Sequence, residues 1–457
     1  MSELITLGYL LKIHLANGTT IDISRFQDSK DEPINYATGI NVKESVYQEN
    51  QNPIGVLSSG TVKVNIVSLD RSLVPENKNS VYFGYMNSTA EIEVGTRIKT
   101  VDSYEDIYFG RYYVSTWTSK AASDSKYKVE INGTDILGII TKNSVPSLDI
   151  KRNISTVDVL NDINEKMNLE LGDKYKFKFN FLTTPKHNLL ATNDIEANDI
   201  STLLNTVCQS TLLNMYVDRS TDKTNRLVNV LDTTVEMGEK EADLSDSKEI
   251  TNSSLEKGAL VGYTGVKVNY SLYSINNSSE IANLGSMSLN PGDNTIENIS
   301  IGGAVFKINT VKVTTNSDVA VDIKSITYNR RTASLVITNN ASENINCELV
   351  ITGQTLNENN LSVIRKSTVD SNEMLEVNNK ILHVNKINAY ATDLLNSISN
   401  RGEILTISGI FDPRKIKLNT IVYVDCSKSI YIENKYRVAE LNWTLCGILK
   451  CEAKLIK

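Results

Sequence analysis

Cysteine and histidine are the side chains best suited to nucleophilic catalysis or metal binding, and this 457-residue sequence contains few of either. A catalytic thiol needs a nearby imidazole to hold its thiolate, and the histidines are far apart in sequence. No two cysteines have the C-x-x-C spacing of a zinc or redox site. We therefore expect buried thiols rather than a disulfide framework or a metal centre. The residues concerned are Cys208, Cys347, Cys426, Cys446, Cys451, His14, His187 and His383.

Paired carboxylates are the next candidates, because two of them flanking a cleft can hydrolyse a glycosidic bond. Glu91 and Glu93 alternate with Ile92 and Val94, so both carboxylates share one face of a predicted strand. We expect that face to be ordinary solvated surface. An embedded cell-wall hydrolase is the alternative.

A second acidic group consists of Asp102, Tyr104, Glu105 and Asp106 and could offer oxygen ligands to calcium. It lacks the spaced ligands and central glycine of an EF-hand loop, so a solvated loop between two strands is the preferred interpretation. The sequence also lacks the G-x-S-x-G, G-x-x-x-x-G-K-[ST] and H-E-x-x-H motifs. We predict no catalytic, cofactor-binding or metal-binding residue, no cofactor, and a protein that is not an enzyme.

The composition limits the possible classes further. Hydrophobic residues make up 40% and charged residues 22%, so the chain can bury real cores. The net charge is −7 and no local cluster of lysine and arginine stands out, which argues against sequence-specific nucleic-acid binding. No basic segment followed by a long apolar run begins the sequence. We therefore expect neither a signal peptide nor an integral membrane segment, and synthesis in a reducing cytoplasm.

Alternation with a period of two residues dominates residues 1–147, which we predict to be an antiparallel β barrel or sandwich. Residues 148–250 change to helical spacing. Ser155 begins one predicted helix, and Asn198 or Asp199 caps a second. Short strands flank both helices, so this part is predicted to be a small α/β domain.

The remainder returns to strands. Residues 276–375 are rich in Ser, Asn and Thr and contain strands at regular spacing, which predicts an inserted β-sandwich. Residues 251–275 together with 376–457 form a predicted second β domain, which includes a third helix that ends at Gly402. No tandem repeat is evident. The fold class is thus mainly β with an α+β insert.

Three stretches, in this order, resemble the hub proteins at the tip of bacteriophage tails and of phage tail-like particles. The first is similar to an "NP-G … S … L-P-N-S-Y-G" run followed by a "G-YYV--W" strand, and it comprises residues 52–59, 73–84 and 110–117. The second comprises residues 289–295 and 351–354. The third is similar to an "A--LL … G-P-L--GD-I-V" run, and it comprises residues 391–395, 409–413 and 418–424. Asn419-Thr420 departs from this pattern, because a Gly-Asp turn is common there.

The resemblance implies a homotrimer in which each chain contributes two tube-like β domains, so that the ring has pseudo-sixfold symmetry. The implied partners are the tail tube or distal tail protein, spike or fibre proteins, and the end of the tape-measure protein. The implied location is the virion, at the tail tip or baseplate, after synthesis in the host bacterial cytoplasm. The implied function is structural: a ring that joins tube to spike and lines the channel for DNA ejection during host-cell entry.

Two further interpretations come from the same residues. A distal tail or adaptor ring protein of the same machine would share the β-rich assembly character. A carbohydrate-binding β-protein is suggested by the 20 tyrosines, because tyrosine packs against sugars as well as against protein partners.

Overall fold

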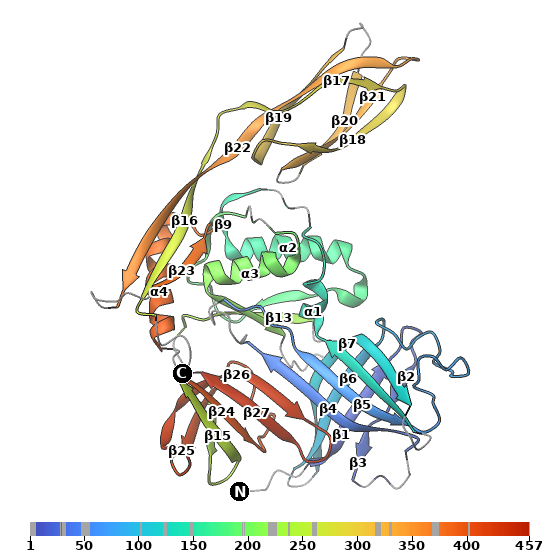
Figure 1. Ribbon diagram of the computed structural model, residues 1–457, viewed down its shortest axis with the longest axis vertical. Coiled ribbons are helices and arrows are strands. Elements are labelled where there is room, and N and C mark those ends of the chain that lie inside the picture. Colours follow the sequence, from blue (N-terminus) through green and yellow to red (C-terminus); the bar gives the residue numbers. More distant parts are fainter. Residues whose placement is uncertain are drawn as a thin grey trace.

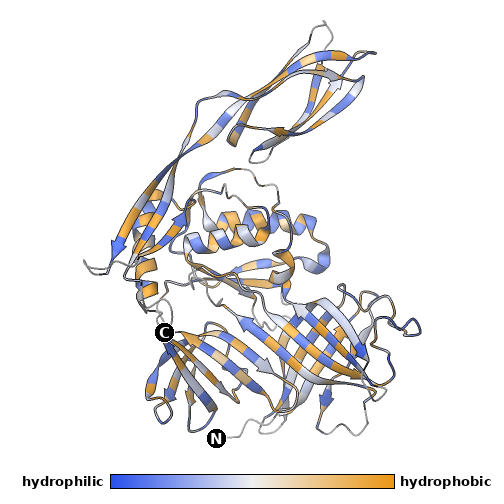
Figure 2. Ribbon diagram, viewed as in Figure 1, coloured by the Kyte–Doolittle hydropathy of each residue, from blue (hydrophilic) through white to orange (hydrophobic). Residues whose placement is uncertain are grey.

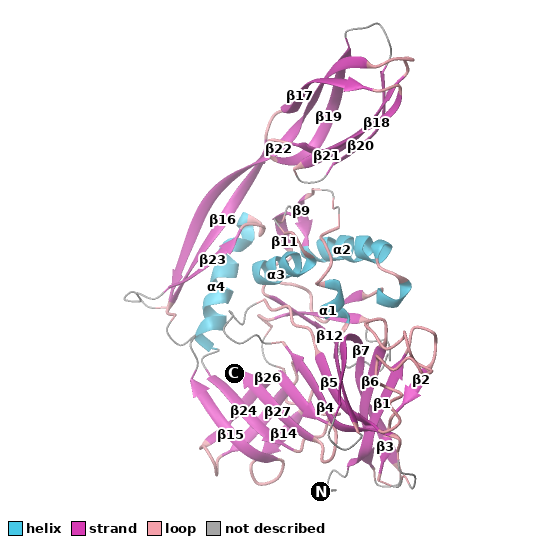
Figure 3. Cartoon of the chain, turned by 45° about the vertical axis from the view of Figure 1, so that its right-hand side comes forward, coloured by secondary structure: helices cyan, strands magenta, loops and turns pink. Residues whose placement is uncertain are grey.

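In its described residues the computed structural model is mainly β and has four α-helices, so the predicted fold class is confirmed (Figures 1 and 3). Asn52, Pro53, Ile54, Asp102 and Gly402, all part of the sequence predictions, lie outside the described residues. The structure describes residues 6–27, 29, 33–46, 55–100, 103–121, 126–146, 148, 150–193, 195, 197–217, 226–235, 238–257, 263–315, 321–328, 331–367, 374–400 and 403–456.

An N-terminal barrel is built from the first eight strands, which pair in the order β4-β5-β8-β7-β6-β1, with β2 and β3 beside β1. The hydroxyl of Tyr9 on β1 accepts a hydrogen bond from the Ala37 amide of β4 at 2.9 Å, and so bridges the two ends of this order. The strands are β1 (Thr6–His14), β2 (Thr20–Asp22), β3 (Arg25–Phe26), β4 (Asn35–Ser45), β5 (Thr61–Ser68), β6 (Glu91–Lys99), β7 (Tyr104–Ala121) and β8 (Tyr127–Thr134).

A C-terminal barrel has the order β15-β24-β27-β26-β25-β14. The hydroxyls of Ser253 on β15 and Ser429 in the turn after β25 lie 3.0 Å apart, so β15 approaches the far side of its own barrel. The strands are β14 (Ala242–Ser245), β15 (Ile250–Lys257), β24 (Glu403–Gly409), β25 (Ile421–Cys426), β26 (Ile432–Thr444) and β27 (Lys450–Ile456).

The two barrels repeat one plan, although the sequence shows no tandem repeat. In chain order, β1, β4, β5, β6, β7 and β8 correspond to β14, β15, β24, β25, β26 and β27, and each strand has the corresponding neighbours in the sheet. One difference is that β1 pairs antiparallel with β6, whereas β14 pairs parallel with β25. The repeat escapes sequence inspection because strand pairing requires only alternating apolar side chains, which many sequences provide.

A small α/β domain lies above the barrels in the view of Figure 1. Both predicted helix starts in it are confirmed: Ser155 accepts from the Asp158 amide at 3.0 Å, and Asp199 accepts from the Thr202 amide at 2.7 Å. Its elements are α1 (Ile136–Ile140), β9 (Arg152–Ser155), α2 (Thr156–Glu170), a 3-10 turn (Asp173–Tyr175), β10 (Lys178–Phe181), β11 (Leu189–Thr192), α3 (Ile200–Thr211), β12 (Leu213–Val217) and β13 (Leu227–Asp232).

An arm rises from this domain on a stalk of strands. The stalk sheet has β16 (Gly265–Ile275) between β22 (Ile345–Lys366) and β23 (Met374–Asn379), and α4 (Val384–Asn400) packs on it. Thus β15 pairs in the C-terminal barrel, whereas β16 pairs in the stalk.

The four domain boundaries expected from the sequence stay a prediction.

A β-sandwich forms the tip of the arm, and β22 runs through both stalk and sandwich (Figure 1). Its apolar core is a separate cluster that shares no residue with the cores of the barrels and the α/β domain. The remaining sandwich strands are β17 (Ser279–Leu289), β18 (Gly292–Ser300), β19 (Ala304–Thr315), β20 (Val321–Tyr328) and β21 (Thr332–Asn339).

Hydropathy alternates along the barrel strands, so that apolar residues of each strand point to one side (Figure 2). The inward residues of both barrels belong to one continuous apolar cluster. Among the described residues, no helix is both long and apolar enough to cross a membrane.

The sandwich should be removable without loss of the remaining fold. Ile275 and Leu356 are register partners on β16 and β22, so replacing residues 276–355 by Asn-Gly should close a two-residue hairpin there. Because the sandwich core is separate, we expect the melting temperature of the remaining chain to change by no more than a few degrees. Calorimetry of both proteins measures this, and loss of all cooperative unfolding in the shortened chain would contradict it.

Candidate functional site

The five cysteines form no disulfide with one another. Four are buried and Cys446 is half-buried, in agreement with the expected buried thiols. Burial raises the pKa of the Cys208 thiol far above its usual value, which makes its nucleophilic thiolate scarce.

Glu91 and Glu93 correct a prediction, because both are buried rather than solvated, at 8% and 6% exposure. Both carboxylates are engaged by basic side chains: Arg111 reaches Glu91 at 3.3 Å and Glu93 at 3.0 Å, Lys174 reaches Glu91 at 3.0 Å, and His14 Nε2 lies 3.3 Å from Glu93. The hydrogen bonds from His14 and then Arg111, opposed by burial, lower the pKa of Glu93 to about 2. The two glutamates do lie on one strand, β6, but neighbouring elements cover both faces of that strand.

The prediction for the second acidic group is also wrong. Its described residues, Tyr104, Glu105 and Asp106, lie in strand β7 rather than in a loop. Asp106 makes a two-point ion pair with Arg97 at 2.6 and 2.9 Å, and the Tyr104 ring lies against the same guanidinium. Glu105 pairs instead with Arg414 of the C-terminal barrel at 3.1 Å. In the described part of the chain no group of three or more His, Cys, Asp or Glu could hold a metal ion.

His187 is fully buried between the α/β domain and α4. Its Nε2 lies 2.9 Å from a carboxylate oxygen of Asp393, whose other oxygen accepts from Lys186 at 2.8 Å. Burial lowers the pKa of His187 despite the opposing charge of Asp393. Through Asp393, the contacts of His187 and Lys186 connect α4 to the α/β domain.

The most distinctive site is the seam at which the two barrels meet. Residues 41–45 of β4 pair antiparallel with residues 440–444 of β26, and this pairing joins the barrels into one 14-stranded sheet. The two strands are almost 400 residues apart in sequence. Their backbone groups satisfy each other, so that neither strand leaves this edge open.

Side chains reinforce the seam on both faces of the sheet. On the inner face the Trp443 indole donates to the Glu44 carboxylate at 3.2 Å and packs edge-to-face against Phe109 at 5.1 Å. On the outer face Lys43 pairs with Glu440 at 3.0 Å. Trp443 is among the largest fully buried side chains of the protein, so a mismatch here would disturb both barrels.

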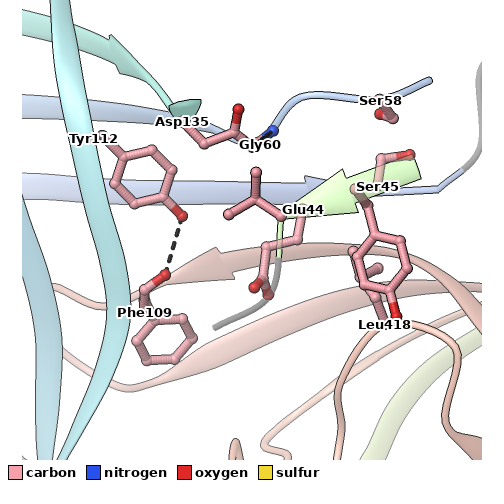
Figure 4. A pocket seen from close by; sticks show the side chains of 10 residues that line it. Glu44, Ser45, Ser58, Gly60, Phe109, Tyr112, Asp135 and Leu418 are labelled. Atoms are coloured by element: carbon pink, nitrogen blue, oxygen red, sulfur yellow. Dashed lines mark hydrogen bonds between the residues drawn. The ribbon is translucent and has the colours of Figure 1, made fainter. Parts of the chain in front are cut away.

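A small polar cavity of about 10 Å³ lies beside the seam (Figure 4). Glu44 enters it from β4, Asp135 from the start of α1, and Tyr112 from β7, where its hydroxyl donates to the Phe109 carbonyl at 3.1 Å. Burial raises the pKa of Asp135 to about 7, against the backbone hydrogen bonds from Gly60 and Gly138. The cavity is at the lower limit for one water molecule, so it is a buried junction and not a ligand pocket.

The seam also holds the α/β domain. The Val46 amide donates to the Ala439 carbonyl at 2.8 Å, and both residues pack with Tyr216 of β12. Gly55 has φ +72° and approaches the Cys208 carbonyl so closely that a Cβ atom there would lie 2.4 Å from its oxygen. The glycine in the hub-like run at residues 52–55 is therefore required where the chain passes the end of α3.

The seam residues Glu44, Trp443 and Asp135 were not predicted as a site. Each stands alone in its own segment, and only the long-range pairing of β4 with β26 unites them. The departure at Asn419 has a physical reason: its φ is +62°, a left-handed conformation that asparagine tolerates nearly as glycine does.

The architecture defines the chain as a two-barrel protein with the fold of bacteriophage tail proteins. The 43 kDa tail protein of prophage MuSo2 from Shewanella oneidensis matches with a TM-score of 0.54 and 9% identity over 98% of each chain. The tail protein from Neisseria meningitidis MC58 matches with a TM-score of 0.51 and 10% identity over 98% of this chain and 97% of that one. No family model and no curated sequence matches this chain. The fold expected from the hub resemblance is thus confirmed.

Acid should destabilise the protein through Glu93. Its folded pKa of about 2 lies below the ordinary value of 4.5, so its stabilising contribution is present above that value and is lost as the pH falls toward 2. Glu93→Gln should lower the free energy of unfolding at pH 7 by up to about 3 kcal/mol and flatten the acid limb. Urea unfolding from pH 7 to 3 measures both, with the exposed Glu452→Gln as the control; equal acid limbs in all three proteins would contradict the assignment.

Trp443→Phe keeps most of the packing at the seam but removes the indole N–H that Glu44 accepts. Leaving a buried carboxylate with one donor fewer should cost about 1–3 kcal/mol. A double-mutant cycle with Glu44→Leu, which removes the acceptor, should show a coupling energy of at least about 0.5 kcal/mol in denaturant titrations. Strictly additive effects would mean that this hydrogen bond contributes nothing to the seam.

Proposed function

We propose that this chain is a structural hub protein at the tip of a phage or phage-like tail. Three copies form a ring that joins the tail tube to a spike or fibres and lines a channel for DNA. The single observation that supports this most is the pair of equivalent barrels joined in one sheet. Such a chain brings two similar surfaces to a ring, so that three chains present six similar positions to a sixfold tube.

Similarity of fold to two tail proteins, one of them from a prophage, over nearly the whole chain supports the same proposal. In this proposal the partners are the tail tube or distal tail protein on one side, the spike or fibre proteins on the other, and the end of the tape-measure protein in the channel. The protein then acts in the virion, at host-cell entry and DNA ejection, after synthesis in the bacterial cytoplasm.

The proposal includes no catalytic step. The paired glutamates that a glycosidase would need are held by Arg111, Lys174 and His14, so they are not open to a sugar ring. The small cavity at the seam could not admit one either. The proposed function is therefore structural: the barrels hold their strand edges and ends in fixed positions for binding to other proteins.

Mass photometry and negative-stain microscopy of the purified full chain test the proposal. We expect a particle of three times the 50.7 kDa of one chain, seen end-on as a ring with six barrel densities. A strictly monomeric protein at micromolar concentration that also fails to bind tube protein would contradict it. A ring of six chains would favour the distal tail or adaptor alternative instead.

A further inference from the structure

Each barrel contains one long strand whose two halves have different neighbours. In the N-terminal barrel, β7 pairs with β6 up to Tyr113 and with β8 from Tyr113 onward, with a bulge within 114–116. In the C-terminal barrel, β26 pairs with β25 up to Arg437 and with β27 from Arg437 onward, with a bulge within 438–440. From Tyr113 and Arg437 onward the two strands therefore correspond residue by residue, with Tyr113 equivalent to Arg437.

Backbone hydrogen bonds next to these strands confirm the correspondence. The Val114 amide donates to the Ala90 carbonyl at 3.0 Å, just before β6 begins. The Val438 amide donates to the Thr420 carbonyl at 3.0 Å, just before β25 begins. These are the same contact in the two barrels.

The second half of β26 is the strand that makes the internal seam, since residues 440–444 pair with β4. The equivalent part of β7 is residues 116–120. In the described part of the chain, this part of β7 pairs with β8 alone. Thr116, Thr118 and Lys120 are exposed, and no described strand pairs with the edge of β7 that corresponds to the edge used by β26.

The counterpart of β4 is β15. Following the register across each barrel, Lys43 opposes Thr61 and then Thr134, while Glu256 opposes Ile404 and then Ile456. Thr134 and Ile456 are equivalent, because Thr134 opposes Tyr113 and Ile456 opposes Arg437. Lys43 of β4 therefore corresponds to Glu256 of β15.

The two halves of β15 have surroundings similar to those of the two halves of β4. The first half of each strand contacts the far side of its own barrel: Ala37 of β4 donates to Tyr9, and the Ser253 hydroxyl of β15 lies near that of Ser429. The second half of β4 forms the internal seam. The second half of β15 ends the sheet, pairs with β24 alone among the described strands, and exposes Ser254 and Glu256.

We propose that β7 of one copy pairs antiparallel with β15 of a second copy, and that this contact reproduces the internal seam between chains. The register follows from the correspondence: Trp117 opposes Lys257, Thr118 opposes Glu256, and Lys120 opposes Ser254. The contact joins two different surfaces, so its repetition builds a ring where the rotation closes, and never a twofold dimer. It rests on the proposed ring function and names the strand edges that build the ring.

Charge complementarity supports this occupant of the edge. In the proposed pairing Lys120 and Glu256 are diagonal neighbours on one face of the sheet, where opposite charges attract. The internal seam also carries a diagonal ion pair, between Lys43 and Glu440 at 3.0 Å, although that pair lies on the opposite diagonal. Both edges are also open strands, which proteins seldom leave unprotected.

Disulfide trapping tests the register. Thr118→Cys with Glu256→Cys, oxidised as the purified full chain, should give covalent multimers up to the size of the ring on a non-reducing gel. The matched control is Lys43→Cys with Asn442→Cys, the equivalent pair of the internal seam, which should oxidise within one chain. Thr118→Cys with Asn252→Cys is shifted along β15 by four residues, about 13 Å, and should not form multimers.

A charge swap tests the same contact without cysteines. Glu256→Lys should weaken ring formation about tenfold, as expected for a loss of about 1.4 kcal/mol, and adding Lys120→Glu should restore it; circular dichroism verifies folding of both exposed variants. If the ring forms but the Thr118–Glu256 pair stays unlinked while the seam control oxidises, this inference is overturned and the proposed ring stands. If no ring forms at all, both are overturned.

Discussion

An open strand edge is the constraint on which this structure depends. A barrel formed by one sheet that does not close completely must find hydrogen-bond partners for the N–H and C=O groups of its two edge strands. Otherwise these groups stay available for pairing with another strand. Here each barrel brings its first and last strands together only at one end. The other end of β4 is satisfied by β26, and this one pairing turns two small barrels into a single body with one continuous apolar core.

The buried polar groups of the seam follow from that pairing. Because β26 crosses from one barrel to the other, Trp443 and Glu44 become inner residues of a junction rather than of a simple barrel interior. Asp135 meets the same junction from α1, with its pKa raised to about 7 by burial. Such groups contribute less to stability than apolar replacements could, but they fix orientation, since only one register satisfies them. In the proposed ring, a fixed angle between the barrels would matter more than stability.

Periodicity in the sequence predicted what local physics decides. The helix caps at Ser155 and Asp199 and the alternating strands were found because capping and pleating depend on neighbours in the chain. Burial of Glu91 and Glu93 was missed because it depends on what covers the second face of β6, which no local pattern reveals. The repeat of the barrels was missed for the same reason: the six strands share an order of pairing, and Tyr113 and Arg437 occupy equivalent positions with unrelated side chains.

The arm shows the opposite solution to the edge problem. In its sandwich, β17, β18, β19 and β20 all carry register shifts, and such bulges twist an edge away from further pairing. The register of β15 against β24 stays regular from Asn252 to Lys257, as does that of β7 against β8 beyond Thr116. The barrels carry register shifts too, but on β15 and β7 these shifts lie before the open segments, which are themselves regular. The proposed contact between chains would therefore use two regular strand segments.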